Sequence, residues 1–204
     1  MKIVGEPAIA DSTCIVVCEL CPWPISAAQI QYPLGQPSRF QKVIKLKKVL
    51  FVCMGNICRS PAGEGVLQSI LARENLQDEI FVDSAGTIGY HAGKPADARM
   101  RQAAERRGYN LTSRARQVNR DDCETFHLIV AMDRDNLRYC HQLAPDHKGK
   151  MKLLSEFLVG DWPEEVPDPY YGGDAGFEKV LDMIEAACPR IILELQNGGA
   201  SGDA

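Results

Sequence analysis

The chain has 204 residues, of which 45% are hydrophobic, and a formal net charge of −4 at pH 7. This composition supports one good core and argues against nonspecific binding to nucleic acid. No apolar run is long enough to span a bilayer, no segment resembles a secretory leader, and the eight cysteines do not form a disulfide framework, so we expect no membrane partner and a reducing, cytoplasmic location.

The first 46 residues differ from the rest because five prolines interrupt every candidate helix: Pro7, Pro22, Pro24, Pro33 and Pro37. We predict an extension over 1–46 that is disordered or loosely packed. Its cysteines, Cys14, Cys18 and Cys21, have the spacing of an iron–sulfur motif. That chemistry needs a large barrel domain, which does not follow, so we interpret them as unstructured thiols.

From residue 47 onward, short apolar runs alternate with helical periodicity. Strands are predicted over 49–52, 80–84, 128–132 and 151–154. Helices are predicted from 61 onward and over 95–107, 119–126, 134–142 and 174–195; the last should begin with Asp174 as its N-cap and be kinked or split at Pro189. The pattern indicates an α/β domain over 47–196, a small doubly wound sheet of about four parallel strands with helices on both faces, and a flexible tail over 197–204.

The loop after the first predicted strand combines a thiol with an arginine at a helix N-terminus. Cys53 is followed by Met54, Gly55, Asn56, Ile57, Cys58, Arg59 and Ser60. The backbone N–H groups of this loop can surround a tetrahedral oxyanion, and Gly55 allows unusual dihedral angles. Arg59 offers a planar fork to two phosphate oxygens, and its positive field favours the thiolate of Cys53. The loop therefore predicts a phosphate site that contains a nucleophile, to whose sulfur Ser60 can donate a hydrogen bond.

A second motif, Asp168-Pro-Tyr-Tyr-Gly, provides a candidate general acid. Asp168 lies between Pro167 and Pro169, which stiffen its backbone. A carboxyl group near a bound dianion tends to keep its proton and can donate it to a leaving oxygen. Tyr170 and Tyr171 could form an aromatic wall for a planar substrate ring. Alone, this motif would be read as a turn; together with Cys53 it indicates phosphoester chemistry.

The segment Val49–Pro61 resembles the signature of the low-molecular-weight protein tyrosine phosphatases, and the Asp168 motif resembles their general-acid loop. The similarity runs from about Lys48 to about Leu195, with both motifs in the family's order. It implies a protein-tyrosine phosphatase that hydrolyses phosphotyrosine and small aryl phosphates through a cysteinyl-phosphate intermediate, without a metal or other cofactor. Phosphotyrosine proteins are then the expected substrates, and the expected oligomeric state is a monomer or weak dimer.

The resemblance also implies roles for residues around the loop. Asn56, Ser60 and Ser84 match polar positions that hold the loop rigid, whereas Ser113 stands where the family usually has histidine. Tyr90 matches a position that often stacks on the substrate ring. Cys53 and Cys58 match a pair that gives the family its redox sensitivity.

Three alternatives share the scaffold. A thioredoxin-coupled arsenate reductase would need resolving cysteines, for which Cys123 and Cys140 are the candidates, but it has no use for Asp168. A protein-arginine phosphatase tends to carry threonine where Ile57 stands. A phosphoprotein-binding module without turnover would not need Cys53, Arg59 and Asp168 together.

Overall fold

The computed structural model describes residues 46–171 and 173–198, with the backbone alone at Tyr171. The predictions for residues 1–45, including the three cysteines there, and for the tail over 199–204 lie outside the described residues.

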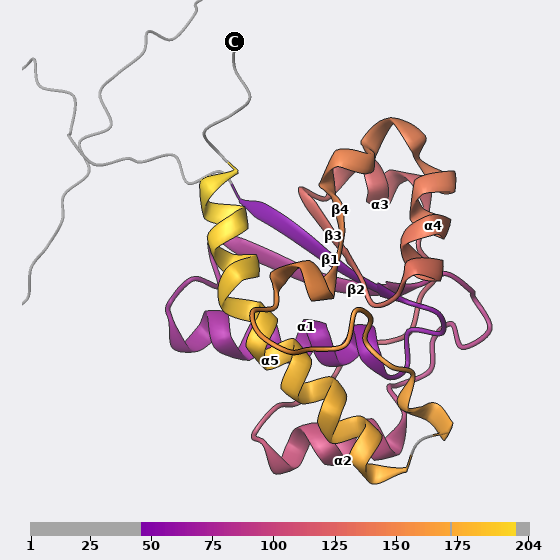
Figure 1. Cartoon of the computed structure of the whole chain (residues 1–204), viewed down its shortest axis with the longest axis vertical. Helices are drawn as coiled ribbons and strands as arrows, with labels where there is room; N and C mark the ends of the chain where they lie inside the picture. Colours follow the sequence, from indigo (N-terminus) through magenta and orange to yellow (C-terminus); the bar gives the residue numbers. More distant parts are fainter. Residues whose placement is uncertain (1–45, 172, 199–204) are drawn as a thin grey trace, which may run out of the picture. The chain divides into compact units, whose positions relative to one another are not determined.

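The centre of the fold is a four-stranded parallel sheet (Figure 1). Its strands are β1 (Lys47–Cys53), β2 (Ile80–Gly86), β3 (Leu128–Ala131) and β4 (Met151–Leu153). Their order is β2-β1-β3-β4, so β1 lies inside the sheet. The register pairs Cys53 with Gly86 and Val52 with Ala131, which brings the carboxyl ends of three strands to one edge. The predicted sheet is confirmed.

Helices cover both faces of the sheet. They are α1 (Arg59–Arg73), α2 (Ala98–Arg106), α3 (Arg120–Thr125), α4 (Arg134–Leu143) and α5 (Asp174–Asn197). Short 3-10 helices occupy Pro145–Lys150, Leu154–Phe157 and Pro169–Tyr171. Val49 and Phe51 of β1 join the core formed with α1, α2 and α5, whereas Leu50 and Val52 join that formed with α3 and α4. This alternation along a strand buried on both sides is typical of a doubly wound sheet.

Three predicted details of the helices were wrong. Of the two outcomes predicted at Pro189, a kink or a split, the split is wrong: α5 runs as one helix to Asn197, one residue into the predicted tail. One lost hydrogen bond is outweighed because this helix buries ten side chains in the core. Its N-cap is Gly173, at a φ of 67°, rather than Asp174. The helix α2 begins at Ala98 instead of Pro95, because Pro95 forms a bridge with Arg114 and Asp97 caps the helix by accepting from Arg99 N.

Among the helices of the described segments, none is long and apolar enough to cross a membrane.

Candidate active site

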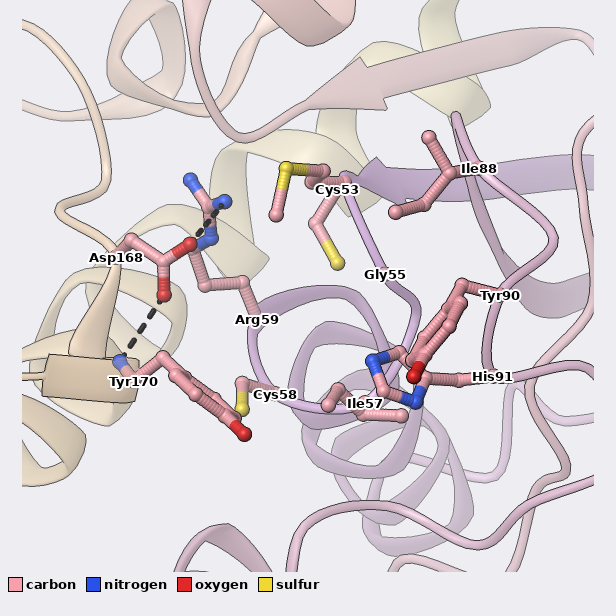
Figure 2. Close-up of a pocket in the computed structure, with 11 residues that line it drawn as sticks. Cys53, Gly55, Ile57, Cys58, Arg59, Ile88, Tyr90, His91, Asp168 and Tyr170 are labelled. Atoms are coloured by element: carbon pink, nitrogen blue, oxygen red, sulfur yellow. Dashed lines mark hydrogen bonds and ion pairs between the residues drawn. The ribbon is translucent and has the colours of Figure 1, made fainter.

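A cavity of about 280 Å³ opens at the carboxyl end of β1 (Figure 2). Nine of the predicted site residues line it: Cys53, Met54, Gly55, Ile57, Cys58, Arg59, Tyr90, Asp168 and Tyr170. Ile88 and His91, from the same loop as Tyr90, complete the lining. The two motifs, more than a hundred residues apart in the chain, therefore meet in one pocket.

The Cys53 sulfur lies at the floor of the pocket and receives polar contacts from the loop. Asn56 N donates to Cys53 Sγ over 3.3 Å, and Ser60 Oγ lies 3.0 Å from the same sulfur. Both contacts would stabilise a thiolate. Ser60 has a single hydroxyl proton and a second acceptor, Ala85 O at 3.1 Å, so its proton can turn between the backbone and the sulfur.

Asn56 fixes the shape of the loop. It adopts a left-handed conformation with φ of 54°, so the unusual dihedral expected at Gly55 is found one residue later. Its side-chain Nδ2 donates to Ser60 Oγ and Ser84 Oγ, both at 2.9 Å, and its Oδ1 accepts from Arg116 N at 2.9 Å. A Cβ at Gly55 would lie 3.1 Å from the ring of His91, a tight contact that a small shift of this side chain would have to relieve.

A buried carboxylate that the sequence did not reveal continues this network. Ser84 Oγ donates to Glu64 Oε2 over 2.6 Å, and Ser113 also hydrogen-bonds to Glu64. Burial raises the pKa of Glu64, although the hydrogen bonds from Ser84 and Ser113 act in the opposite direction. The serine at the position usually held by histidine thus reaches the network through Glu64. The available signal was a glutamate one helical turn after Ser60, on the face of α1 that meets the sheet.

Gly86, at the end of β2, lets the loop approach the neighbouring strand. A Cβ at this position would lie 2.7 Å from Met54 O and 3.0 Å from Asn56 N. The first distance is shorter than real Cβ contacts and both are to backbone atoms, so a side chain here would require the loop to move.

Two carboxylates, those of Asp133 and Asp168, hold the guanidinium group of Arg59. Its NH1 donates to Asp133 Oδ2 over 2.6 Å, its NH2 donates to Asp168 Oδ2 over 3.1 Å, and NH1 also contacts Val166 O. Burial lowers the pKa of Arg59, but the charges of Cys53, Asp168 and Asp133 outweigh it and the net shift is upward. The guanidinium group therefore stays charged. Asp133 also caps α4, by accepting from Asn136 N.

Aromatic side chains stand at the mouth of the pocket (Figure 2). Tyr170 N donates to Asp168 Oδ1 over 3.0 Å, which fixes the carboxyl group, and the Tyr170 ring stacks under the guanidinium of Arg99. Tyr90 contacts His91 edge to face and is 78% exposed, so its ring is available to a ligand. The side chain of Tyr171 lies outside the described residues.

The remaining cysteines differ in access to the pocket. Cys58 lines it, and burial, followed by the charges of Asp97, Cys53 and Asp168, raises the pKa of its thiol to about 12. Cys123 and Cys140 are fully buried in the core on the other face of the sheet from Cys53. They cannot reach Cys53 to relay a disulfide as the arsenate reductase alternative requires. Within residues 46–171 and 173–198, no group of three or more His, Cys, Asp or Glu side chains could hold a metal ion.

Comparison with known proteins agrees with this site. The family model described as low molecular weight phosphotyrosine protein phosphatase matches residues 48–200. A Synechocystis protein is 45% identical over 152 residues, 72% of this chain and 96% of its own length. The low molecular weight protein-tyrosine-phosphatase of Streptomyces coelicolor is 42% identical, over 69% of this chain and 88% of its own.

Solved structures show the same likeness. A protein tyrosine phosphatase from Entamoeba histolytica, crystallised with Hepes in the active site, is 43% identical and superimposes with a TM-score of 0.72 over 75% of this chain and 99% of its own. The family match covers well over half of the chain and includes both motifs of the pocket. The chain therefore belongs to the low molecular weight phosphotyrosine protein phosphatase family.

Proposed function

We propose that this phosphatase hydrolyses phosphotyrosine through a cysteinyl-phosphate intermediate, with Cys53 as the nucleophile, Arg59 as the phosphate-binding cation and Asp168 as the general acid. The observation that carries the proposal is the convergence of these three side chains in one pocket whose mouth is aromatic. In this proposal the loop residues 54–58 and Ser60 form the phosphate cradle, with Ser84 and Ser113 behind them.

In the first step, the Cys53 thiolate attacks phosphorus, a sulfur–phosphorus bond forms and the bond to the phenolic oxygen breaks. Asp168 transfers its proton to that oxygen, so tyrosine leaves as a neutral phenol. Arg59 and the loop N–H groups hold the equatorial oxygens, where the charge of the transition state is spread. The contact between Arg59 NH2 and Asp168 supports this arrangement, because the proposed acid and the proposed phosphate-binding cation are neighbours.

In the second step, water attacks the phosphocysteine, the carboxylate of Asp168 accepts a proton from that water, and the Cys53 thiolate is the leaving group. Ser60 turns its hydroxyl proton from Ala85 O to the sulfur, and Asn56 N donates to it as well. These two donors stabilise the departing thiolate.

The walls of the pocket support an aromatic phosphoester over other substrates. Ile57, Tyr90 and Tyr170 present apolar or aromatic surface to the cavity, which suits a phenyl ring better than the charged guanidinium of phosphoarginine. Phosphoserine carries its phosphate on a short side chain and gains nothing from these walls. Phosphotyrosine proteins are thus the proposed substrates, and a site that depends on a free thiolate suits the reducing cytoplasm.

The test compares the purified protein on matched phosphotyrosine, phosphoserine and phosphoarginine peptides, together with the variant Asp168→Ala. We expect phosphotyrosine to have the highest kcat/KM. Asp168→Ala should slow hydrolysis of phenyl phosphates by about 10²–10⁴-fold. The loss should shrink for p-nitrophenyl phosphate and more acidic leaving groups, which need no proton. An equal loss across leaving groups would give Asp168 a structural role and remove the general acid from the mechanism.

A further inference from the structure

The catalytic pocket continues into a second groove of about 450 Å³ on the side of Met54 and Ile88. The two hollows share Met54, Ile88, Arg59 and Asp168 as walls. We call the outer part the Met54 groove; it is lined by Met54, Ile88, Asp135, Asn136, Tyr139 and Glu165. A substrate chain that places its phosphotyrosine beside Cys53 has this groove directly beside its neighbouring residues.

Two large apolar side chains are left open to solvent in the wall of the groove. Met54 is 50% exposed and Ile88 is 41% exposed, and Figure 2 shows Ile88 at the rim of the catalytic pocket. Apolar surface beside a polar cleft is typical of a binding site rather than of an ordinary surface.

A buried polar atom in the groove has no partner within the described protein. Asn136 is only 3% exposed, yet its Oδ1 accepts no hydrogen bond. A buried carbonyl oxygen of this kind normally has a donor. Because this oxygen is closed off from solvent, a ligand in the groove would reach it only after the wall had moved, so it is not counted among the groups that meet a ligand.

The charge around the groove is negative. Carboxylates gather here from the start of α4 and from the segment that ends at Asp168: Asp133, Asp135, Glu164, Glu165 and Asp168. Fewer guanidinium groups pair with them, those of Arg59, Arg134 and Arg138. Asp135 pairs with Arg138 and Glu165 pairs with Arg134. Both pairs are solvent-exposed, and such pairs exchange partners at little cost, so either carboxylate can turn to a cation in the groove.

From these observations we infer that the Met54 groove binds the substrate polypeptide next to its phosphotyrosine and favours a lysine or arginine there. The cationic side chain pairs with Asp135 or Glu165, and its aliphatic stem covers Met54 and Ile88. This inference rests on the proposed function and adds the sequence context of the substrate to it.

The test uses phosphotyrosine peptides that carry Lys, Gln or Glu at positions flanking the phosphotyrosine on either side. At low ionic strength, kcat/KM should fall from Lys to Gln to Glu on one side, by roughly two- to tenfold in total, which is the range that one or two exposed ion pairs supply. Added salt should reduce the preference.

The double variant Asp135→Asn/Glu165→Gln should abolish most of the preference while hydrolysis of p-nitrophenyl phosphate, which is too small to occupy the groove, stays unchanged. The matched control is Glu74→Gln/Asp78→Asn. It removes two exposed carboxylates just before β2, at the amino-terminal ends of the strands rather than at the carboxyl ends, where the groove lies. It changes the net charge equally and should keep the preference.

Equal rates on the Lys and Glu peptides would contradict the proposed role of the Met54 groove. So would a preference that survives in Asp135→Asn/Glu165→Gln. Neither result would contradict phosphotyrosine hydrolysis itself. If the control variant also lost the preference, the preference would come from the net charge of the protein rather than from the Met54 groove, and the inference would be wrong. Failure to hydrolyse any phosphotyrosine peptide would overturn the proposed function itself.

Discussion

Removal of the Ser84 hydroxyl should both destabilise the protein and slow the enzyme, because this group joins the loop to the buried carboxylate behind it. Ser84 is 1% exposed. It accepts from Asn56 Nδ2 at 2.9 Å and donates to Glu64 Oε2 at 2.6 Å. The variant Ser84→Ala loses both bonds and leaves their partners buried.

The size of the effect follows from what is left unpaired. A buried hydrogen bond to a charged group contributes about 1.5–3 kcal/mol, and a neutral one about 1 kcal/mol. Asn56 Nδ2 keeps its bond to Ser60, so only one of its protons is orphaned. We therefore expect Ser84→Ala to lower the free energy of unfolding by about 2–4 kcal/mol. For a domain of this size, that corresponds to a fall in melting temperature of about 4–16 °C.

The assay is urea denaturation, with kcat on p-nitrophenyl phosphate measured well below the melting temperature. The matched control is Ser69→Ala, which removes a hydroxyl bonded only to Gly65 O within α1 and should change stability by less than about 0.5 kcal/mol. Ser84 holds Asn56, whose backbone N donates to Cys53 Sγ. We therefore expect kcat to fall in Ser84→Ala but not in Ser69→Ala. If the two variants were equally stable and equally active, the network would not support the loop and this reasoning would be refuted.

Three further predictions concern the same site. Gly86→Ala should lower kcat and weaken inhibition by inorganic phosphate, because its Cβ would push against Met54 O and Asn56 N; unchanged kinetics would show that the loop tolerates the shift. Glu64 has a raised pKa in the fold, so its contribution to stability is complete below its ordinary pKa of 4.5 and is lost as the pH rises through the higher folded value. Glu64→Gln should flatten the pH dependence of stability in that window, whereas an unchanged slope in denaturation curves would assign it to other groups. Peroxide should oxidise the Cys53 thiolate to a sulfenic acid, which the Cys58 thiol captures as a disulfide with loss of water; dithiothreitol should restore the wild type but not Cys58→Ser, and equal recovery would leave Cys58 without a protective role.

The parts of the fold that depend on local pattern could be predicted from the sequence. The strands of the sheet each combine an apolar run with a flanking turn or helix, so their positions and parallel arrangement followed from the alternation. The effect of Pro189 on α5 could not be predicted from local pattern, because packing of the whole helix on the core decides whether a proline interrupts it. The start of α2 depended on a bridge between Pro95 and Arg114, which is a contact between distant segments.

The site shows the same division. Cys53, Arg59 and Asp168 were predicted because each belongs to a short motif with a chemical meaning. Glu64 and Arg116 were not predicted as site residues, because their roles arise from tertiary contacts with Ser84 and Asn56. Asn136 could not have been predicted as part of a second groove, since an unpaired oxygen is visible only when its surroundings are known.

The most direct test of the central claim is to trap the phosphorylated enzyme. The protein should be mixed with p-nitrophenyl phosphate, quenched in acid within a few turnovers, digested and examined by mass spectrometry. One phosphoryl group should be found on the peptide that contains Cys53, and none in Cys53→Ser, which should still bind inorganic phosphate. Full turnover by Cys53→Ser, or a phosphoryl group carried by any other residue, would contradict the central claim.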